Sequence, residues 1–392
     1  MAAVHTAERL FSSSYAQARQ RFMDATAKRA DHLESFPLDA RGAHAEELST
    51  DVAVIGSSNA RSMLILTSAT HGVEGFCGSA CQLALIEDEE LLTRASDAGV
   101  ALLLIHAVNP YGFSWSSRTN EHNVDLNRNA QSFKESLPAN PDYDELHALL
   151  IPRTWPPTEE NRRAISAYVE RRGSRGFRDA VSRGQYTHPD GIFFGGSSNQ
   201  RSLLTLDHVL RTHAAGFADL GWIDFHTGLG PFGHGEKIFA GRRDQEEVAR
   251  SRRWWGQDIA VPFAGSSASA EITGHLASII DLACPHARRG LIALEFGTVP
   301  FEQMVDALRG EAWLRGHPDA SPELAAQIRQ TLRDAFYPDQ DVWKGMVLGQ
   351  SRVAILQGLA GLGCESEIGR DLQVERPAAA ASSPNETPWR QK

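Results

Sequence analysis

The chain has 392 residues and a formal net charge of −10, and 42% of its residues are hydrophobic. This composition is typical of a globular enzyme with a sizeable core, and α/β enzymes often use such a length as one unit. The acidic balance argues against a nucleic-acid binder that works by neutralising phosphates. Since no run of about eighteen apolar residues occurs, we expect no membrane span.

The N-terminus and the cysteines indicate a cytoplasmic protein. No basic region followed by an apolar one begins the chain, so we expect no secretory signal. The four cysteines form neither a dense disulfide pattern nor a zinc knuckle, and we interpret them as small buried hydrophobes in a reducing compartment. They are Cys77, Cys81, Cys284 and Cys364. The sequence gives no indication of the oligomeric state.

In chain order, a helical periodicity over the first thirty residues is followed by short apolar runs that alternate with amphipathic stretches. The apolar runs predict strands at Asp51–Ser57, Ser62–Ser68, Ala101–Val108, Gly221–Phe225, Lys237–Ala240 and Gly290–Phe296. The amphipathic stretches predict helices at Gly78–Arg94, Ser202–Ala215, Gln245–Ile259 and Phe301–Arg315. Nearly continuous apolar strands are typical of a sheet that is covered on both faces. We therefore predict a three-layer α/β/α fold with a mixed, largely parallel central sheet.

Two segments depart from this alternation. Residues 131–199 are rich in Pro, Arg and Asp, with one helical stretch near Thr158–Arg172, and we interpret them as an insertion that shapes the mouth of a pocket. Residues 374–392 form a Pro/Ala/Ser-rich tail that we expect to be disordered. We interpret residues 1–373 as a single catalytic domain.

His71 and Glu74 lie in THGVEGFCGSA, where an apolar strand meets a helical run. Ligands of open α/β sheets collect at the carboxyl ends of strands, which is where this segment falls. A histidine and a glutamate three residues apart can converge on one ion, and imidazole with carboxylate suits zinc. The alternative is that they are two unrelated surface residues.

His226 is the third candidate metal ligand, because WIDFHTGLG again places a histidine where an apolar strand meets a Gly-rich turn. Catalytic zinc usually has three protein ligands and one open position. Asp224, two residues earlier on the same strand face, is either a partner that orients His226 or a sheet-end residue bonded to backbone.

The loop after the strand at Ala101–Val108 concentrates Arg118, Asn127 and Arg128. Arginine binds carboxylates through paired hydrogen bonds and stabilises a developing oxyanion. One arginine would then serve the tetrahedral intermediate and the other a substrate carboxylate. The alternative is a set of solvated ion pairs with Glu121 or Asp125.

Glu295 is the polar interruption of the apolar strand LIALEFGTVP. A buried carboxylate is costly unless it is paired or functional. Beside a metal-bound water it is the expected general base, which later passes the proton to the leaving amine. The alternative is a structural ion pair with Arg288 or Arg289.

Several other features of the sequence are better explained by structural roles. Gly228, Gly230 and Gly233 match GxGxxG, but a strand rather than a helix is expected to follow, which argues against nucleotide binding. We expect Trp254–Trp255 to pack on the sheet and His106 to lie in the core. Neither His106 nor the nearby His122 and His234 is expected to bind zinc.

Taken in order, HxxE, NPYG, Arg118, DLNRN, the strand-terminal histidine and the later strand glutamate resemble the M14 zinc carboxypeptidases. Within that clan the chain is most similar to the bacterial DUF2817 group, and the succinylglutamate desuccinylase and aspartoacylase branch shares the framework. The resemblance spans residues 71–295 and implies a zinc carboxypeptidase-like fold.

The resemblance also implies residue roles. His71, Glu74 and His226 would bind one zinc ion, Arg118 would polarise the scissile carbonyl, and Glu295 would act as base and then acid. Asn127 and Arg128 would bind a substrate carboxylate. The implied enzyme is a zinc metallohydrolase that cleaves a peptide or amide bond in a small carboxylate-bearing substrate by a Glu-activated, zinc-bound water.

One departure from the peptidase pattern leaves the substrate open. Carboxypeptidases supply a mobile Tyr between the last zinc histidine and the final glutamate, whereas this chain has no Tyr between His226 and Glu295. Residues 264–275 stand in that place and offer only Ser and Thr hydroxyls. An aspartoacylase-like deacylase of N-acyl amino acids is therefore the alternative, followed by a non-catalytic binding protein on the same fold. Another divalent metal also suits such a site.

Overall fold

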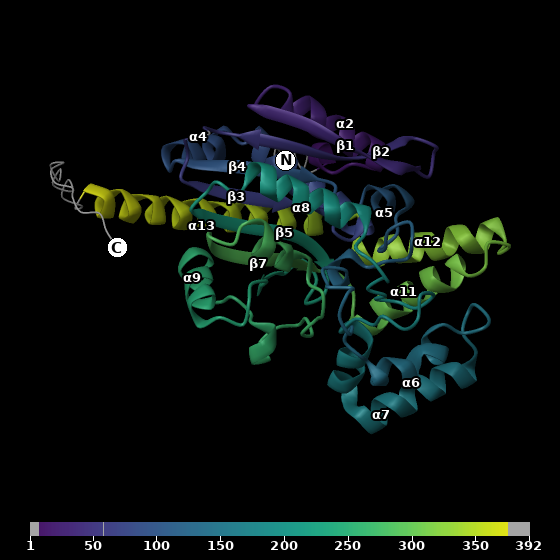
Figure 1. Ribbon diagram of the computed structural model, residues 1–392. Helices are drawn as coiled ribbons and strands as arrows, with labels where there is room; N and C mark the ends of the chain where they lie inside the picture. The colour runs from purple at the N-terminus through teal and green to yellow at the C-terminus, as the bar shows by residue number, and fades with distance from the viewer. Residues whose placement is uncertain (1–7, 58, 375–392) are drawn as a thin grey trace, which may run out of the picture.

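A seven-stranded sheet forms the centre of the computed structural model, which describes residues 8–57 and 59–374 (Figure 1). The strand order is β1-β2-β4-β3-β5-β7-β6. The strands are β1 (His32–Arg41), β2 (Glu47–Ile55), β3 (Ser62–Thr67), β4 (Val100–His106), β5 (Asp219–Gly228), β6 (Gly235–Phe239) and β7 (Arg288–Gly297).

The sheet is mixed, as predicted. Strands β4, β3, β5 and β7 are parallel neighbours, while β1, β2 and β6 run antiparallel at the two sides. All six predicted strands are present. The sequence prediction missed β1, because this strand lies at the sheet's edge and its residues alternate between exposed and partly buried positions. Such a strand lacks the continuous apolar run that marks its central neighbours.

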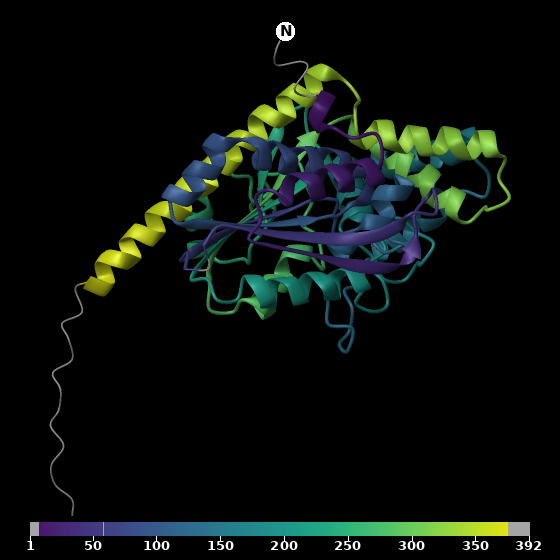
Figure 2. The ribbon, with the colours of Figure 1, turned by 90° about the horizontal axis from the view of Figure 1, so that it is seen from above.

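Helices cover both faces of the sheet, which confirms the three-layer prediction (Figure 2). Leu64 and Leu66 of β3 pack on one face, whereas Met63 and Ile65 pack on the other. The first face carries α2 (Tyr15–Thr26), α3 (Gly75–Glu87), α4 (Glu89–Asp97), α9 (Gln245–Trp255) and α13 (Asp341–Val374). The second carries α8 (Arg201–His213), η4 (Leu276–Ile279) and α10 (Ile280–Ala283).

The predicted helix at Gly78–Arg94 is two helices. Asp88 leaves the helical conformation with φ −91° and ψ 97°, and its side chain accepts hydrogen bonds from the amides of Glu90 and Leu91. An aspartate in that position ends α3 and caps α4, since its carboxylate satisfies amides at the start of the new helix.

Residues 131–199, which we predict to be an insertion, contain α6 (Pro141–Leu150) and α7 (Glu159–Ser182), so the prediction of one helical stretch was incomplete. Both helices pack with α11 (Phe301–Arg315) and α12 (Pro322–Phe336) in a third apolar cluster. This cluster lies beside the carboxyl ends of the parallel strands (Figure 1). The short elements α5 (Pro110–Trp115), η1 (Gly72–Glu74), η2 (Leu126–Arg128) and η3 (Pro262–Ala264) lie in the connections.

Three sequence predictions concern the remaining parts of the chain. Within residues 8–57 and 59–374, none of the helices combines the length and apolar character needed to cross a bilayer. Cys77, Cys81 and Cys284 are buried, but Cys364 is exposed, so its assignment to the core was wrong. The disordered tail predicted from residue 374 lies outside the described residues, except for its first residue in α13.

Candidate active site

The predicted site residues meet at the carboxyl end of the parallel strands. His71 follows β3, and Glu74 ends the short helix η1 that comes next. His226 and Glu295 lie directly opposite each other in the register of β5 and β7. The parallel arrangement therefore brings residues that are more than 200 positions apart together at the carboxyl ends of the strands, as expected for an α/β fold.

The Glu74 carboxylate lies between two imidazoles. Its Oε1 atom is 2.8 Å from His71 Nδ1, and its Oε2 atom is 2.9 Å from His226 Nδ1. The two Nδ1 atoms are 3.2 Å apart, and all three side chains are at least 96% buried. Although burial opposes ionisation, the two histidines hold the pKa of Glu74 below its usual range. Two imidazole nitrogens and one carboxylate at this spacing fit the donor set of a catalytic zinc ion.

Carboxylates contact the far nitrogens of both histidines. Asp224 Oδ2 is 2.7 Å from His226 Nε2, while its other oxygen accepts hydrogen bonds from Thr67 and Thr70. Asp125 Oδ1 is 3.3 Å from His71 Nε2, and Arg118 Nη2 lies closer to the same nitrogen, at 2.8 Å. A carboxylate placed as Asp224 is fixes the orientation of the His226 imidazole and makes its other nitrogen a better ligand. Asp224 thus contacts the histidine and two hydroxyls. These contacts agree with the interpretation of Asp224 as a partner that orients His226.

Arg118 reaches the same cluster. Its Nη1 atom donates to Glu74 Oε1 at 3.1 Å, and its Nε atom donates to Asp125 at 3.1 Å. The guanidinium also lies over the Phe193 ring, 4.9 Å from the ring centroid. Burial disfavours the charge, but the carboxylates of Asp125 and Glu74 raise the pKa of Arg118 overall. The ion pair with Asp125 is therefore buried beside the histidines and not solvated.

Asn127 and Arg128 line the cavity from the adjoining turn. Arg128 donates through Nε and Nη2 to the Ser182 carbonyl, at 3.2 and 2.6 Å, and its guanidinium also lies over Phe193. Burial lowers the pKa of Arg128 to about 10, which leaves the side chain charged at neutral pH. Asn127 Oδ1 accepts a hydrogen bond from the Leu276 amide, and its NH₂ group is available to donate to a ligand.

Glu295 has no cationic partner among the described residues. Its Oε1 atom accepts from the Leu229 amide at 2.9 Å. The predicted alternative partners are engaged elsewhere, since Arg288 pairs with Asp219 and Arg289 with Glu247. The structural ion pair proposed as an alternative for Glu295 is therefore wrong. Burial, assisted by the nearby Glu74 carboxylate, raises the pKa of Glu295 to about 7.

A cavity of about 220 Å³ connects these residues. Residues 131–199 contribute Ser182 and Phe193 to its lining. Phe336 lines another part, and the strands β6 and β7 contribute apolar side chains. The cavity is small and partly apolar, with a few charged groups gathered at one place, which is typical of sites for small ligands.

His275 is a cavity residue that the sequence interpretation missed, although it ends the segment from which only hydroxyls were expected. Its Nδ1 atom accepts a hydrogen bond from the Ala277 amide. The neutral ring must then carry its proton on Nε2, for which no partner is present in the described part of the chain. Burial lowers the pKa of His275 to about 4, so this donor is neutral near pH 7.

The histidines and tryptophans that we expected to have no part in the site lie outside the cavity. His106 is fully buried, 3.0 Å from Ser79 Oγ and stacked on Phe22, as expected of a core histidine. Trp254 and Trp255 are buried against the sheet. The glycine-rich turn leads into β6 and not into a helix. Neither His122 nor His234 lines the cavity.

Comparison with known proteins identifies one family. The family model described as "Protein of unknown function (DUF2817)" matches residues 11–350. No curated protein matches the chain in sequence.

Several solved structures are similar to the chain. Carboxypeptidase A from Helicoverpa armigera shares 12% identity, with 88% of this chain and 73% of that chain covered and a TM-score of 0.40. A Pseudomonas aeruginosa metallo-carboxypeptidase shares 12%, with 88% and 68% covered and a TM-score of 0.39. A succinylglutamate desuccinylase from Silicibacter sp. shares 14%, with 78% and 65% covered and a TM-score of 0.35.

Proposed function

The chain belongs to the DUF2817 family, and we propose that it is a zinc-dependent amide hydrolase acting on a small substrate with a free carboxylate. One observation carries this proposal. The buried His71, Glu74 and His226 cluster shares a cavity with Glu295, a carboxylate that has no cationic partner among the described residues. A metal-ligand set beside an unpaired carboxylate is the arrangement that metal-assisted hydrolysis requires.

The proposed metal ligands are the Nδ1 atoms of His71 and His226 and the carboxylate of Glu74. When bound there, zinc would polarise the scissile carbonyl and lower the pKa of a coordinated water toward about 7. Asp224 and Asp125 would hold the two imidazoles in the required orientation from their far nitrogens.

Glu295 is the proposed base. The Leu229 amide occupies its Oε1 atom, which leaves Oε2 to take a proton from the attacking water. The same oxygen would then deliver that proton to the nitrogen of the leaving amine. A pKa near 7 suits both steps, because the carboxyl can gain and lose a proton close to neutral pH.

The remaining polar groups are proposed to bind and orient the substrate. Arg118 would stabilise the developing oxyanion, since its guanidinium already reaches Glu74. Arg128 and the Asn127 amide would hold the substrate carboxylate. His275 Nε2 would donate a hydrogen bond from the segment in which carboxypeptidases carry their mobile Tyr.

A deacylase of N-acyl amino acids is the second candidate. Two observations favour it over a peptidase, namely the small size of the cavity and the lack of any Tyr between His226 and Glu295. In that reaction Arg128 would hold the carboxylate of the amino acid product, and the aromatic side chains Phe193 and Phe336 would restrict the length of the substrate. A non-catalytic protein with the same site would bind metal without turnover.

A substrate panel with zinc-reconstituted protein tests the proposal. Dipeptides, longer peptides and N-acyl amino acids are compared with the same compounds after amidation of the terminal carboxylate. We expect turnover of at least one free-carboxylate class, and its loss on amidation. Preference for N-acyl amino acids over dipeptides would select the deacylase. Metal binding without turnover of any compound would contradict the proposed catalysis.

A further inference from the structure

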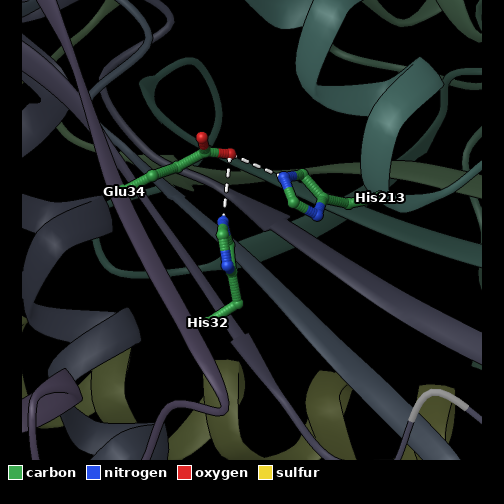
Figure 3. A group of neighbouring side chains, drawn as sticks. All are labelled: His32, Glu34 and His213. Carbon is green, nitrogen blue, oxygen red and sulfur yellow. Dashed lines mark hydrogen bonds and ion pairs between the residues drawn. The ribbon is translucent and has the colours of Figure 1, made fainter.

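A second cluster of metal-ligating side chains lies at the opposite side of the sheet from β6. His32 and Glu34 come from the edge strand β1, and His213 comes from the last turn of α8 (Figure 3). We call these three residues the edge cluster. One ligand atom from each lies within 4.8 Å of the others. None of the three lines the cavity described above.

The fold explains why these side chains converge. His32 and Glu34 are two residues apart on a strand, so their side chains leave the same face. That face is the one covered by α8, because Phe36 continues it and packs edge-on against His208 of that helix. His213 ends α8 and reaches back over β1, which connects residues almost 180 positions apart in the sequence.

The two imidazoles aim at one oxygen. Glu34 Oε1 lies 2.6 Å from His213 Nε2 and 3.5 Å from His32 Nε2, and Figure 3 shows both rings directed toward it. A hydrogen bond between Glu34 and His213 alone would join α8 to β1 without any contribution from His32. At 3.5 Å, His32 is close to that oxygen but shares no hydrogen bond with it that meets ordinary geometry. The ring of His32 also lies against that of His213, with the ring centroids 5.0 Å apart, so the three side chains form one compact group.

We propose that the edge cluster binds a second divalent transition-metal ion of the zinc class, which clamps the end of α8 onto the edge strand. Zinc ligands at about 2.0–2.2 Å in tetrahedral geometry lie about 3.3 Å apart from one another. The His32–Glu34 separation already matches this value, and the His213–Glu34 pair needs to open by less than about 1 Å, which side-chain torsions provide.

The solvent exposure of the edge cluster determines whether water can reach a bound ion. The side chain of His32 is 51% exposed and that of Glu34 is 30% exposed, whereas that of His213 is 13% exposed. Water can therefore complete the coordination, and the ion can exchange with solvent. Two imidazoles and one carboxylate favour Zn²⁺, Ni²⁺ or Cu²⁺ over Mg²⁺, which prefers oxygen ligands.

Metal titration of the full chain tests this site without reference to activity. Chelator-treated protein is titrated with Zn²⁺ alone at pH 7.5, and bound equivalents are counted by competition with a chromophoric chelator. His32→Ala is the test variant, since this exposed side chain makes no hydrogen bond that its removal would break. His44→Ala, in an exposed turn after the same strand, is the matched control.

We expect His32→Ala to lose one class of Zn²⁺ sites, or to weaken it at least tenfold, while His44→Ala retains it. We also expect Zn²⁺ to raise the Tm of the wild type through this site, and that increment to shrink in His32→Ala but not in His44→Ala. Because the result depends on the difference between two variants, it is independent of what the cavity site binds. Equal numbers and affinities of sites in wild type and His32→Ala would overturn the proposal.

Discussion

His226 Nε2 lies 2.7 Å from Asp224 Oδ2, two residues earlier on the same strand, so the imidazole presents Nδ1 to Glu74 and the cavity. Asn at position 224 would keep the shape but lose the charge that orients and polarises the ring. We predict that Asp224→Asn weakens zinc binding about 10–100-fold. The measurement is competition with a chromophoric chelator.

Asp219→Asn provides the matched control for that prediction. Asp219 is also a buried carboxylate of β5, but it lies at the other end of the strand and pairs with Arg288. Its substitution should lower the free energy of unfolding and leave the zinc affinity unchanged. Equal losses of zinc affinity in the two variants would show that Asp224 acts through general stability and not through His226.

Glu295→Gln should lower kcat about 10²–10⁴-fold while the protein keeps its metal, because the amide cannot accept a proton from water. Glu271→Gln is the control, since Glu271 also lines the cavity but is paired with Arg243 and is given no role in the reaction. Steady-state kinetics and elemental analysis on the same preparations separate the two effects. Loss of zinc in Glu295→Gln would assign the residue to the metal site instead.

The pH profile gives a further test of Glu295. The base works ionised, and burial raises its pKa to about 7, so activity should rise with pH along an acid limb. A zinc cation nearby favours the ionised carboxylate, which places the limb at or below pH 7 in the loaded enzyme. A profile of kcat/KM whose acid limb lies above pH 8 would contradict this assignment.

His275→Ala should reduce kcat/KM at least tenfold, because it removes a neutral donor from the cavity. His275→Gln, which keeps an N–H donor, should restore part of the loss. Since His275 also caps η4 through Nδ1, the alanine variant should lose about 1 kcal/mol of stability, which thermal unfolding measures separately. If Ala and Gln variants are equally slow, the side chain acts only through the cap.

His106 predicts a pH dependence of stability. Burial lowers its pKa to about 4 from an unfolded value near 6.5, so the folded protein holds this ring neutral. Below pH 6.5 the unfolded chain binds a proton that the folded chain does not, and stability falls as pH falls toward 4. The loss is of order 3 kcal/mol.

Urea unfolding at pH 7 and pH 4.5 measures this effect. His106→Gln remains neutral over that range, so its free energy of unfolding should fall less than that of the wild type. His122→Gln, at an exposed histidine outside the core, is the matched control and should follow the wild type. An identical decrease in wild type and His106→Gln would mean that other groups cause the acid sensitivity.

The sequence predicted the features that depend on local patterns. The central strands were recognisable because they are apolar on both faces, and His71, Glu74, His226 and Glu295 because each stands where such a strand ends or is interrupted. The partly exposed strand β1 lacks that pattern and was missed.

Features that arise only from the tertiary fold were not predictable. Asp125 contacts His71 across 54 positions, and no local spacing indicates that pairing. His275 was overlooked because the segment before it offers no regular pattern, and its place in the cavity depends on the turn that leads into η4. The convergence of His213 with β1 likewise needs α8 to pack across the edge of the sheet.

The most direct test of the proposed hydrolase combines metal content with turnover in one experiment. Chelator-treated protein is reconstituted with increasing zinc, and hydrolysis of the best free-carboxylate amide substrate is measured at each step in wild type and in His71→Ala. Turnover in the wild type should rise with the first tightly bound equivalent, and His71→Ala should lose both that equivalent and the activity. Turnover that is independent of zinc, or that is unchanged in His71→Ala, would contradict the account.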